Sequence, residues 1–371
     1  MKNTLFYDKV RNAIQVHGGF HNAHLHLDRA NTLDDGMVDQ GRVQVLESSH
    51  ISLQKKHALI ATVHAGPAYD SENLLARVSD TTEVMIEVGT RRADTMVDVT
   101  PDRVGLTALE TIQGYAKTVA DQIEVQAAAY TPLGFSDDTP EQWDVFLQGV
   151  EIANFIGSLP EADDRDDYPT HIGFDEHCLR MIELCKQTGK MVHVHTDQRN
   201  IPQEDGTERL IKCLRQAGNP VDRGTEPLIW AVHMISPSTY DQPRWDAFVE
   251  GMLECNIGVI SCPSAAVGMR AIRPLMTPNG NAIPRILELA AAGVPIRLGS
   301  DNVADMCSPS TTADLMDEVF ILSAAIRFYQ PEILAKLASG TVLTADERAT
   351  ILDHLEKNDV EVSKVVQRWA T

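Results

Sequence analysis

The residues best suited to chemistry in this sequence are histidines and one aspartate that each follow an apolar run. His24 and His26 form a His-x-His pair after the first such run. Alternate side chains of a β-strand point to the same side, so both imidazoles can reach one ion. Three more polar residues end later apolar runs in the same way: His195, His233 and Asp301.

Three imidazoles and a carboxylate form a ligand set that suits zinc or ferrous iron. A divalent ion in such a set lowers the pKa of a bound water toward neutrality and so provides a nucleophile. The pattern therefore predicts metal-dependent hydrolysis, provided that the fold brings these distant residues together.

The elements that must position these residues alternate between strand and helix along the chain. Apolar runs predict strands near 18–28, 95–99, 123–130, 154–158, 191–195, 227–233, 258–262 and 294–301. Helical patterns separate them at 43–61, 71–78, 103–120, 139–152, 174–189, 206–217, 241–256 and 282–292. Repeated βα units with polar residues at the carboxyl ends of the strands predict an α/β fold, a (β/α)8 TIM barrel.

Beyond Asp301 the sequence is helical in pattern, at 313–328, 331–338 and 345–357. Little β pattern is left, so we expect extra C-terminal helices and little or no appended β-sandwich. Residues 1–371 are interpreted as a single domain, with a barrel core of about 18–330 and a helical extension over 331–371.

Composition restricts the partners that we expect. The net charge is −21, whereas binding to nucleic acid needs clustered lysine and arginine. The six cysteines form no CxxC pair and are expected to be reduced thiols.

The first residues lack the apolar segment of a signal peptide, and no stretch approaches 18 apolar residues. We therefore expect a cytoplasmic protein with a small-molecule substrate and no nucleic-acid or membrane partner. Barrels of this kind commonly form homo-oligomers, but the sequence identifies no interface.

These histidines and Asp301, in this order along the chain, resemble the metal-binding and catalytic residues of the amidohydrolase superfamily, and most closely those of its cytosine deaminase-like branch. The resemblance covers 18–310 and rests on the His-Leu-His-Leu-Asp run 24–28, on His195, His233 and Asp301, and on the runs 95–99 and 299–305. It implies a metal-dependent enzyme whose ligands are His24, His26, His195 and Asp301. By the same resemblance, His233 polarises the bound water or the substrate, and Asp301 transfers the proton to the leaving nitrogen. The predicted fourth strand offers no lysine, which implies one divalent ion: zinc, or else iron or manganese.

Two positions depart from the deaminase pattern. Gln198 stands where that branch has a glutamate that moves a proton, and an amide cannot do so. The segment 130–134 has no amide side chain to read a pyrimidine. We therefore expect hydrolysis of a C–N bond in a small cyclic amide or nitrogen heterocycle. The alternatives are an aminohydrolase (deaminase) of a pyrimidine-like or related base, and a barrel that binds ligand without turnover.

Four residues are candidates for substrate binding: Gln198, Asp98, Arg270 and Arg273. A guanidinium would hold an anionic or strongly polar group, although exposed arginines more often form solvated ion pairs. Asp301 could alternatively cap a helix. His193, one alternation before His195 on the same strand, is expected to pack or hydrogen-bond. His21 and His64 are expected to be structural or loop residues. Asp28 is expected either to orient the loop that carries His24 and His26 or to be a local turn residue.

Overall fold

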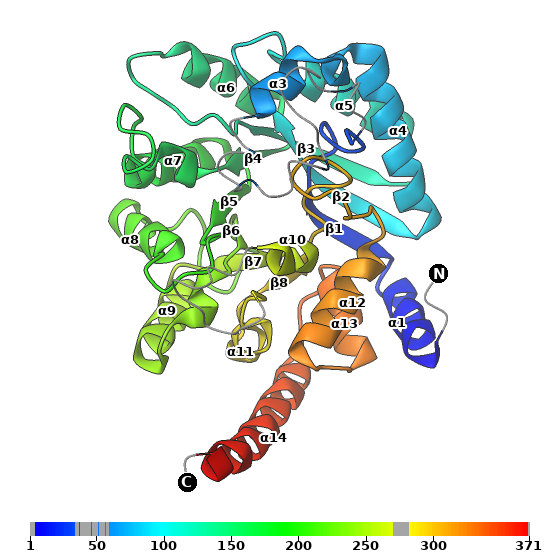
Figure 1. Cartoon of the computed structure of the whole chain (residues 1–371), viewed down its shortest axis with the longest axis vertical. Helices are drawn as coiled ribbons and strands as arrows, with labels where there is room; N and C mark the ends of the chain where they lie inside the picture. The colour runs from blue at the N-terminus through cyan, green and yellow to red at the C-terminus, as the bar shows by residue number, and fades with distance from the viewer. Residues whose placement is uncertain are drawn as a thin grey trace.

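Eight parallel strands form one sheet in which each strand pairs with its neighbours in sequence, from β1 to β8. The computed structural model describes residues 4–33, 37, 46, 51, 56, 59–269 and 282–369. The strands are β1 (Phe20–Leu25), β2 (Thr90–Asp98), β3 (Glu124–Tyr130), β4 (Phe155–Ser158), β5 (Val192–Thr196), β6 (Ile229–His233), β7 (Ile257–Ser261) and β8 (Ile296–Leu298). Figure 1 shows them running through the centre of the molecule.

The sheet closes where β8 meets β1. Leu25 and Asp301 form a parallel bridge, and the Asp301 N–H donates to the carbonyl of His24 at 2.9 Å. Gly299 allows this approach, because a Cβ there would lie 2.7 Å from the carbonyl oxygen and 2.8 Å from the Cβ of His24. Closure of the barrel therefore brings together His24 and Asp301, the first and last metal ligands predicted from the sequence.

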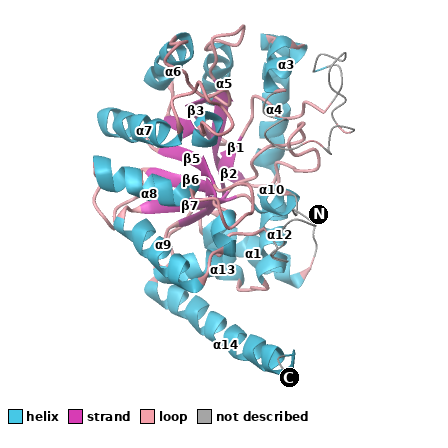
Figure 2. Ribbon diagram, turned by 60° about the vertical axis from the view of Figure 1, so that its left-hand side comes forward, coloured by secondary structure: helices cyan, strands magenta, loops and turns pink. Residues whose placement is uncertain are grey.

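Helices surround the sheet on its outer side, as Figure 2 shows. They are α1 (Leu5–Val16), α3 (Ile60–Ala65), α4 (Ser71–Glu87), α5 (Thr107–Thr118), α6 (Glu141–Ile152), α7 (Phe174–Thr188), α8 (Gly206–Ala217), α9 (Gln242–Glu254), α10 (Pro263–Gly268), α11 (Ile286–Ala292), α12 (Leu315–Ile326), α13 (Pro331–Ala338) and α14 (Ala345–Trp369). Short 3-10 turns are η3 (Pro67–Tyr69), η4 (Pro160–Asp163) and η5 (Ser236–Thr239). The predicted (β/α)8 barrel with additional C-terminal helices is confirmed.

Burial explains why these segments form these elements. Every residue of β4 to β8 is buried, because the outer face packs on helices and the inner face fills the barrel. The helices bury one apolar stripe, which in α8 consists of Leu210, Ile211, Cys213 and Leu214. Asp241 begins α9 by accepting the Arg244 N–H, and Gly189 ends α7 in the left-handed region at φ 67°.

Two small apolar clusters fill the barrel interior below the site. One contains Ala23, Trp230, Val232, Ile260, Cys262 and Ala265. The other contains Met96, Ala128, Tyr130, Phe155, Leu159 and Ala162, and Met191 packs against both. At the amino end of the barrel, the Arg297 guanidinium stacks 4.0 Å from the centre of the Trp230 ring. The interior is therefore a packed core, as in other barrels of this type.

Some boundaries differ from the sequence prediction for physical reasons. β8 ends at Leu298, and after it only single contacts continue the pairing: the Gly299 N–H donates to Ser261, and Asp301, at φ 60°, bridges to Leu25. α14 continues past 357 to Trp369, since no glycine or proline stops it. α1 was not predicted, and it buries Val10, Ala13 and Ile14. Most of the predicted helix 43–61 lies outside the described residues.

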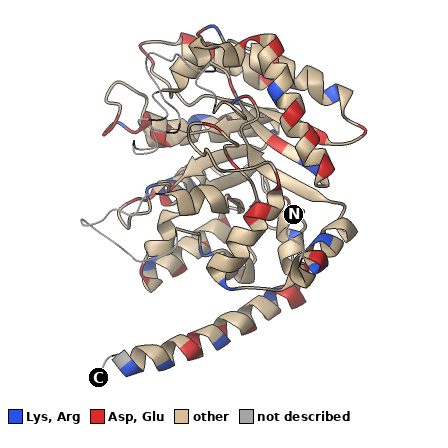
Figure 3. Ribbon diagram, turned by 45° about the vertical axis from the view of Figure 1, so that its right-hand side comes forward, with Lys and Arg blue, Asp and Glu red and all other residues tan. Residues whose placement is uncertain are grey.

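α14 projects away from the barrel (Figures 1 and 2) and carries side chains of both charge signs along its length (Figure 3). Its first part packs against α11, whereas Val360, Val365 and Val366 are exposed. In the described part of the chain, no helix combines the length and apolar character needed to span a bilayer.

Gly299→Ala tests the contact that closes the barrel. The added Cβ must push β8 away from His24, so we expect a loss of about 1–3 kcal/mol in the free energy of unfolding. Urea unfolding followed by circular dichroism measures this. Gly114→Ala is the matched control, because a Cβ there meets nothing within 4 Å. Equal stability of Gly299→Ala and the wild type would contradict this role of Gly299.

Candidate metal centre

Five side chains converge at the carboxyl end of the barrel. The Oδ1 of Asp301 lies 3.3 Å from Nε2 of His26 and 3.7 Å from Nε2 of His24, while its Oδ2 lies 3.9 Å from Nε2 of His233. Two groups have ligand atoms that all lie within 4.8 Å of one another: His24, His195 and His233, and His24, His26 and Asp301. The structure thus brings together every metal and catalytic candidate predicted from the sequence.

The positions of these residues at the ends of strands determine where their side chains point. His24 belongs to β1 and His26 follows it, so both point inward by strand alternation. His233 and Asp301 adopt positive φ angles of 72° and 60°, which are uncommon for residues with side chains. Such backbone conformations concentrate at functional sites, where the surrounding fold maintains them.

The donor set fits a divalent ion. Nδ1 of His195 donates to the carbonyl of Ser158 at 2.9 Å, which leaves the Nε2 lone pair free to bind an ion. Both ring nitrogens of His24 and Nδ1 of His233 are buried without a hydrogen-bond partner among the described residues. Unsatisfied buried nitrogens are costly, and a metal ion at this point would satisfy one nitrogen of each ring that it binds. His26 is arranged differently: Arg29 donates to its Nδ1, which places the proton of the neutral ring on Nε2, 3.3 Å from Oδ1 of Asp301.

The electrostatics keep these groups in their ligand forms. Burial lowers the pKa of His24 and of His195 well below the usual value, and neighbouring histidines lower both further. Burial also lowers the pKa of His26 to about 4. Burial alone would raise the pKa of Asp301, but His233 and His26 outweigh it and hold this pKa below its usual range. At neutral pH the imidazoles are therefore neutral and the carboxylate is ionised, as metal binding requires.

A buried polar network stands behind His26. Asp28 accepts the Asp98 N–H at 2.8 Å and the Tyr69 hydroxyl at 2.9 Å. Oδ2 of Asp98 lies 3.0 Å from Nε2 of His64 and 3.9 Å from Nε of Arg29. Asp98, a candidate for substrate binding, does not line the cavity described below. It lies beside Arg29, and Arg29 contacts His26.

The other sequence candidates occupy distinct places. His193 lies below the site, with its ring 4.6 Å from the centre of Phe155. His21 bonds to Asp94 at the amino end of the barrel, and Nδ1 of His64 lies 2.7 Å from Asp102. Arg270 and Arg273 lie outside the described residues.

A cavity of about 910 Å³ opens above the converging side chains. His26, His195, His233 and Asp301 line its floor, together with Tyr130. Gln198 lines the cavity as well, and its Nε2 donates to Oε2 of Glu161 at 3.1 Å. With the NH2 group directed at Glu161, the amide oxygen of Gln198 is left as an acceptor.

Several residues at the site were missed by sequence reasoning. The neighbour of Gln198, Asp197, binds the Gly206 and Thr207 N–H groups and so begins α8. Glu161 of η4 hydrogen-bonds to Gln198, and Glu318 of α12 lines the cavity together with Asp301, although Glu161 lies far from Gln198 in sequence. Burial, with smaller contributions from Asp301 and Asp317, raises the pKa of Glu318 to about 8. An isolated acidic residue in a helical pattern gives no sequence signal of such burial.

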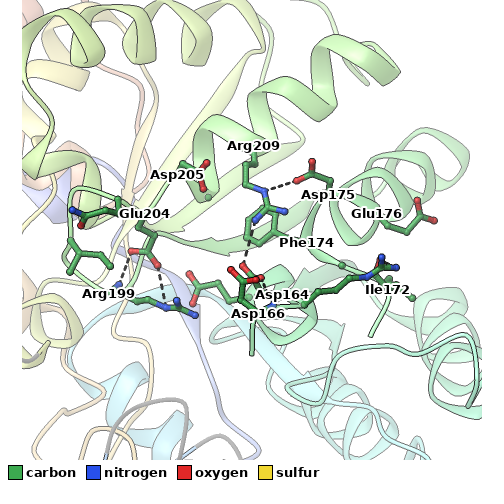
Figure 4. Close-up of a pocket in the computed structure, with 16 residues that line it drawn as sticks. Asp164, Asp166, Ile172, Phe174, Asp175, Glu176, Arg199, Glu204, Asp205 and Arg209 are labelled. Carbon is green, nitrogen blue, oxygen red and sulfur yellow. Dashed lines mark hydrogen bonds and ion pairs between the residues drawn. The ribbon is translucent and has the colours of Figure 1, made fainter. Parts of the chain in front are cut away.

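A second cavity of about 670 Å³ lies beside α7 and α8 (Figure 4). Its arginines are engaged by carboxylates: Arg209 bonds to Asp175 at 2.6 Å, and Nε of Arg199 lies 3.8 Å from Glu204. Arg199 and Ile201 also line the larger cavity, so the two adjoin. The second cavity contains none of the converging histidines.

No family model matches the chain. Among curated proteins, an uncharacterized protein of Haemophilus influenzae is 28% identical over 290 residues, which are 76% of this chain and 96% of that protein. A pterin deaminase of Rhizobium rhizogenes is 23% identical over 225 residues, which are 61% of this chain and 48% of the relative, so the match spans about half of its length.

Among solved structures, 5-methylcytosine deaminase from Klebsiella pneumoniae liganded with phosphonocytosine gives a TM-score of 0.71 at 19% identity, covering 86% of this chain and 74% of that one. N-isopropylammelide isopropylaminohydrolase from Burkholderia multivorans gives 0.62 at 18% identity, covering 86% and 72%. Guanine deaminase from C. acetobutylicum gives 0.55 at 12% identity, covering 87% and 72%. These likenesses confirm the barrel fold predicted from the sequence.

His24→Gln and His193→Gln separate ligands from packing residues. We expect His24→Gln to lower bound zinc well below about one equivalent, because the remaining ligands are incomplete. His193→Gln is expected to keep the metal and to lose only thermal stability. Metal analysis after dialysis, alongside thermal unfolding, reads both effects. Full metal content in His24→Gln would contradict the assignment.

Glu318→Gln tests the burial of this carboxyl. Since the folded-state pKa of Glu318, about 8, lies above the usual 4.5, its favourable contribution to stability is present at low pH and is lost as pH rises through about 8. The wild type should therefore lose stability relative to Glu318→Gln between about pH 5 and 9, by roughly 1.4 kcal/mol for each unit of pKa difference. Urea unfolding across this range measures the difference. Parallel pH profiles would show that Glu318 is not held protonated.

Proposed function

We propose that this chain is a metal-dependent hydrolase that cleaves a C–N bond of a small cyclic amide or nitrogen heterocycle. The observation that carries the proposal is the convergence of His24, His26, His195 and His233 on Asp301, with ligand atoms within 4.8 Å inside each group. The similar proteins support it, because they are deaminases and an aminohydrolase of nitrogen heterocycles.

We propose that one divalent ion, most simply zinc, is held by His24, His26, His195 and Asp301. When bound, such an ion activates water as a nucleophile at neutral pH. Iron and manganese remain alternatives, because nitrogen and carboxylate ligands accept all three metals. Nδ1 of His233 is buried without a hydrogen-bond partner among the described residues. Together with His24 and His195, His233 forms a second group of side chains that could hold an ion.

In this proposal the chain's own residues move protons and hold the substrate. Ionised Asp301 accepts the proton released as water attacks and delivers it to the leaving nitrogen. Nε2 of His233, 3.9 Å from the Asp301 carboxylate, stabilises the oxygen on which charge develops. The amide oxygen of Gln198, oriented through Glu161, accepts an N–H of the substrate and transfers no proton.

Deamination is the second candidate, and the names of the relatives favour it specifically. It requires Asp301 to carry out the proton transfer alone, since Gln198 replaces the glutamate. Release of ammonia identifies deamination, and ring opening without ammonia identifies amide hydrolysis.

A cytoplasmic location is part of the same proposal. All six cysteines are free, and five are buried. This pattern is typical of a reducing compartment.

Asp301→Asn tests the proposed reaction. The amide cannot accept a proton, so we expect kcat/KM on any substrate found among cyclic amides and aminated heterocycles to fall at least about 10³-fold. Ammonia release and ultraviolet absorbance report turnover, and metal analysis shows whether the ion is retained. Asp353→Asn, an exposed change on α14, is the control. Tight ligand binding without product in the zinc-loaded wild type would instead indicate a binding protein.

A further inference from the structure

Glu318 is a buried carboxyl that the proposed reaction does not use. It lies on α12, and its side chain is 1% exposed. It lines the same cavity as His26, His195 and Asp301. Its Oε2 accepts the Ser264 N–H at 2.8 Å, at the start of α10. Glu318 is therefore fixed on the wall formed by α10 and α12, above the metal centre.

The surroundings of Glu318 do not compensate its charge. No lysine or arginine of the described residues forms an ion pair with it, and the charged groups that act on it are the carboxylates Asp301 and Asp317. Apolar residues of the same wall, including Ala265, Met269 and Ile321, also face the cavity. A buried acid among apolar groups and like charges is costly unless a hydrogen-bond donor reaches it.

Ser264 donates to Glu318 through its N–H and its hydroxyl, and the rest of the carboxyl is available to the cavity. Capping α10 occupies Oε2, and a glutamine or an asparagine would accept the Ser264 N–H equally well. A structural cap therefore does not require an ionisable group at this position. Cavities that bind small molecules typically combine apolar walls with a few placed polar groups, and Glu318 is such a group here.

We propose that Glu318 is a specificity-determining residue that accepts an N–H of the substrate, on the edge remote from the bond that is cleaved. This inference rests on the proposed function and narrows its substrate class to nitrogen heterocycles with a ring N–H or an amino group at that edge. Gln198, from the loop after β5, and Glu318, from α12, would then read two edges of one ring above the ion.

Matched pairs of heterocycles test the proposal. Cytosine and 1-methylcytosine, and adenine and 9-methyladenine, differ in one ring N–H opposite the amino-bearing carbon. Dissociation constants are measured by calorimetry on the zinc-loaded protein, with ammonia assayed in the same samples. For a compound that is turned over, kcat/KM replaces the dissociation constant.

We expect the wild type to prefer the N–H member of at least one pair by about 10- to 100-fold, the effect of one hydrogen bond to a charged or acidic group. Glu318→Gln keeps an acceptor for Ser264 but turns an NH2 toward the ligand, so this preference should fall to about 3-fold or less. Glu318→Ala should abolish it. Glu332→Gln, an exposed change on α13, should retain it.

The outcomes separate this inference from the proposed function. A purely structural Glu318 would weaken both members of a pair equally in the variants and leave their ratio unchanged, which would overturn the proposal. Failure of every panel member to bind would overturn it as well. Ammonia release without N–H preference would contradict the role of Glu318 and retain the hydrolase. A preference for the N–H member without ammonia or ring-opened product would support the role of Glu318 and contradict the hydrolase.

Discussion

The backbone hydrogen bond from Asp301 to His24 is the contact on which the rest of the structure depends. It closes the barrel between β8 and β1, and it places the carboxylate of Asp301 within 3.7 Å of Nε2 of both histidines of the His-x-His pair. Gly299 makes the contact sterically accessible. Fold closure and assembly of the site are therefore a single event, so a change that opens the barrel here also disperses the ligands.

Burial determines the protonation states of the histidines at the site. The same desolvation that lowers the pKa of His24, His26 and His195 keeps these rings neutral and ready to bind an ion. The nitrogens of His24 then have no hydrogen-bond partner in the described structure, an arrangement that costs stability in the metal-free protein. A bound ion would engage one of these nitrogens and recover part of this cost, so metal binding and folding should be coupled.

Much of this arrangement could be predicted from the sequence, because strand alternation and strand-end positions are local properties. The pair His24 and His26, and the later stations His195, His233 and Asp301, lie at the strand ends where the pattern placed them. What could not be predicted depends on contacts between distant segments. The Ser158 carbonyl that orients His195, the Glu161 carboxylate that orients Gln198, and the burial of Glu318 have no local signature. Asp98 illustrates the same limit, since only the fold shows that it contacts His64 and Arg29 outside the cavity.

The central claim is that these side chains jointly hold one ion, and X-ray absorption spectroscopy of the zinc-loaded protein tests it most directly. We expect a first shell of nitrogen and oxygen at about 2.0–2.1 Å, with the outer-shell scattering of about three imidazoles and no sulfur. A shell made of oxygen alone, or one containing cysteine sulfur at about 2.3 Å, would show that these side chains do not hold the ion together.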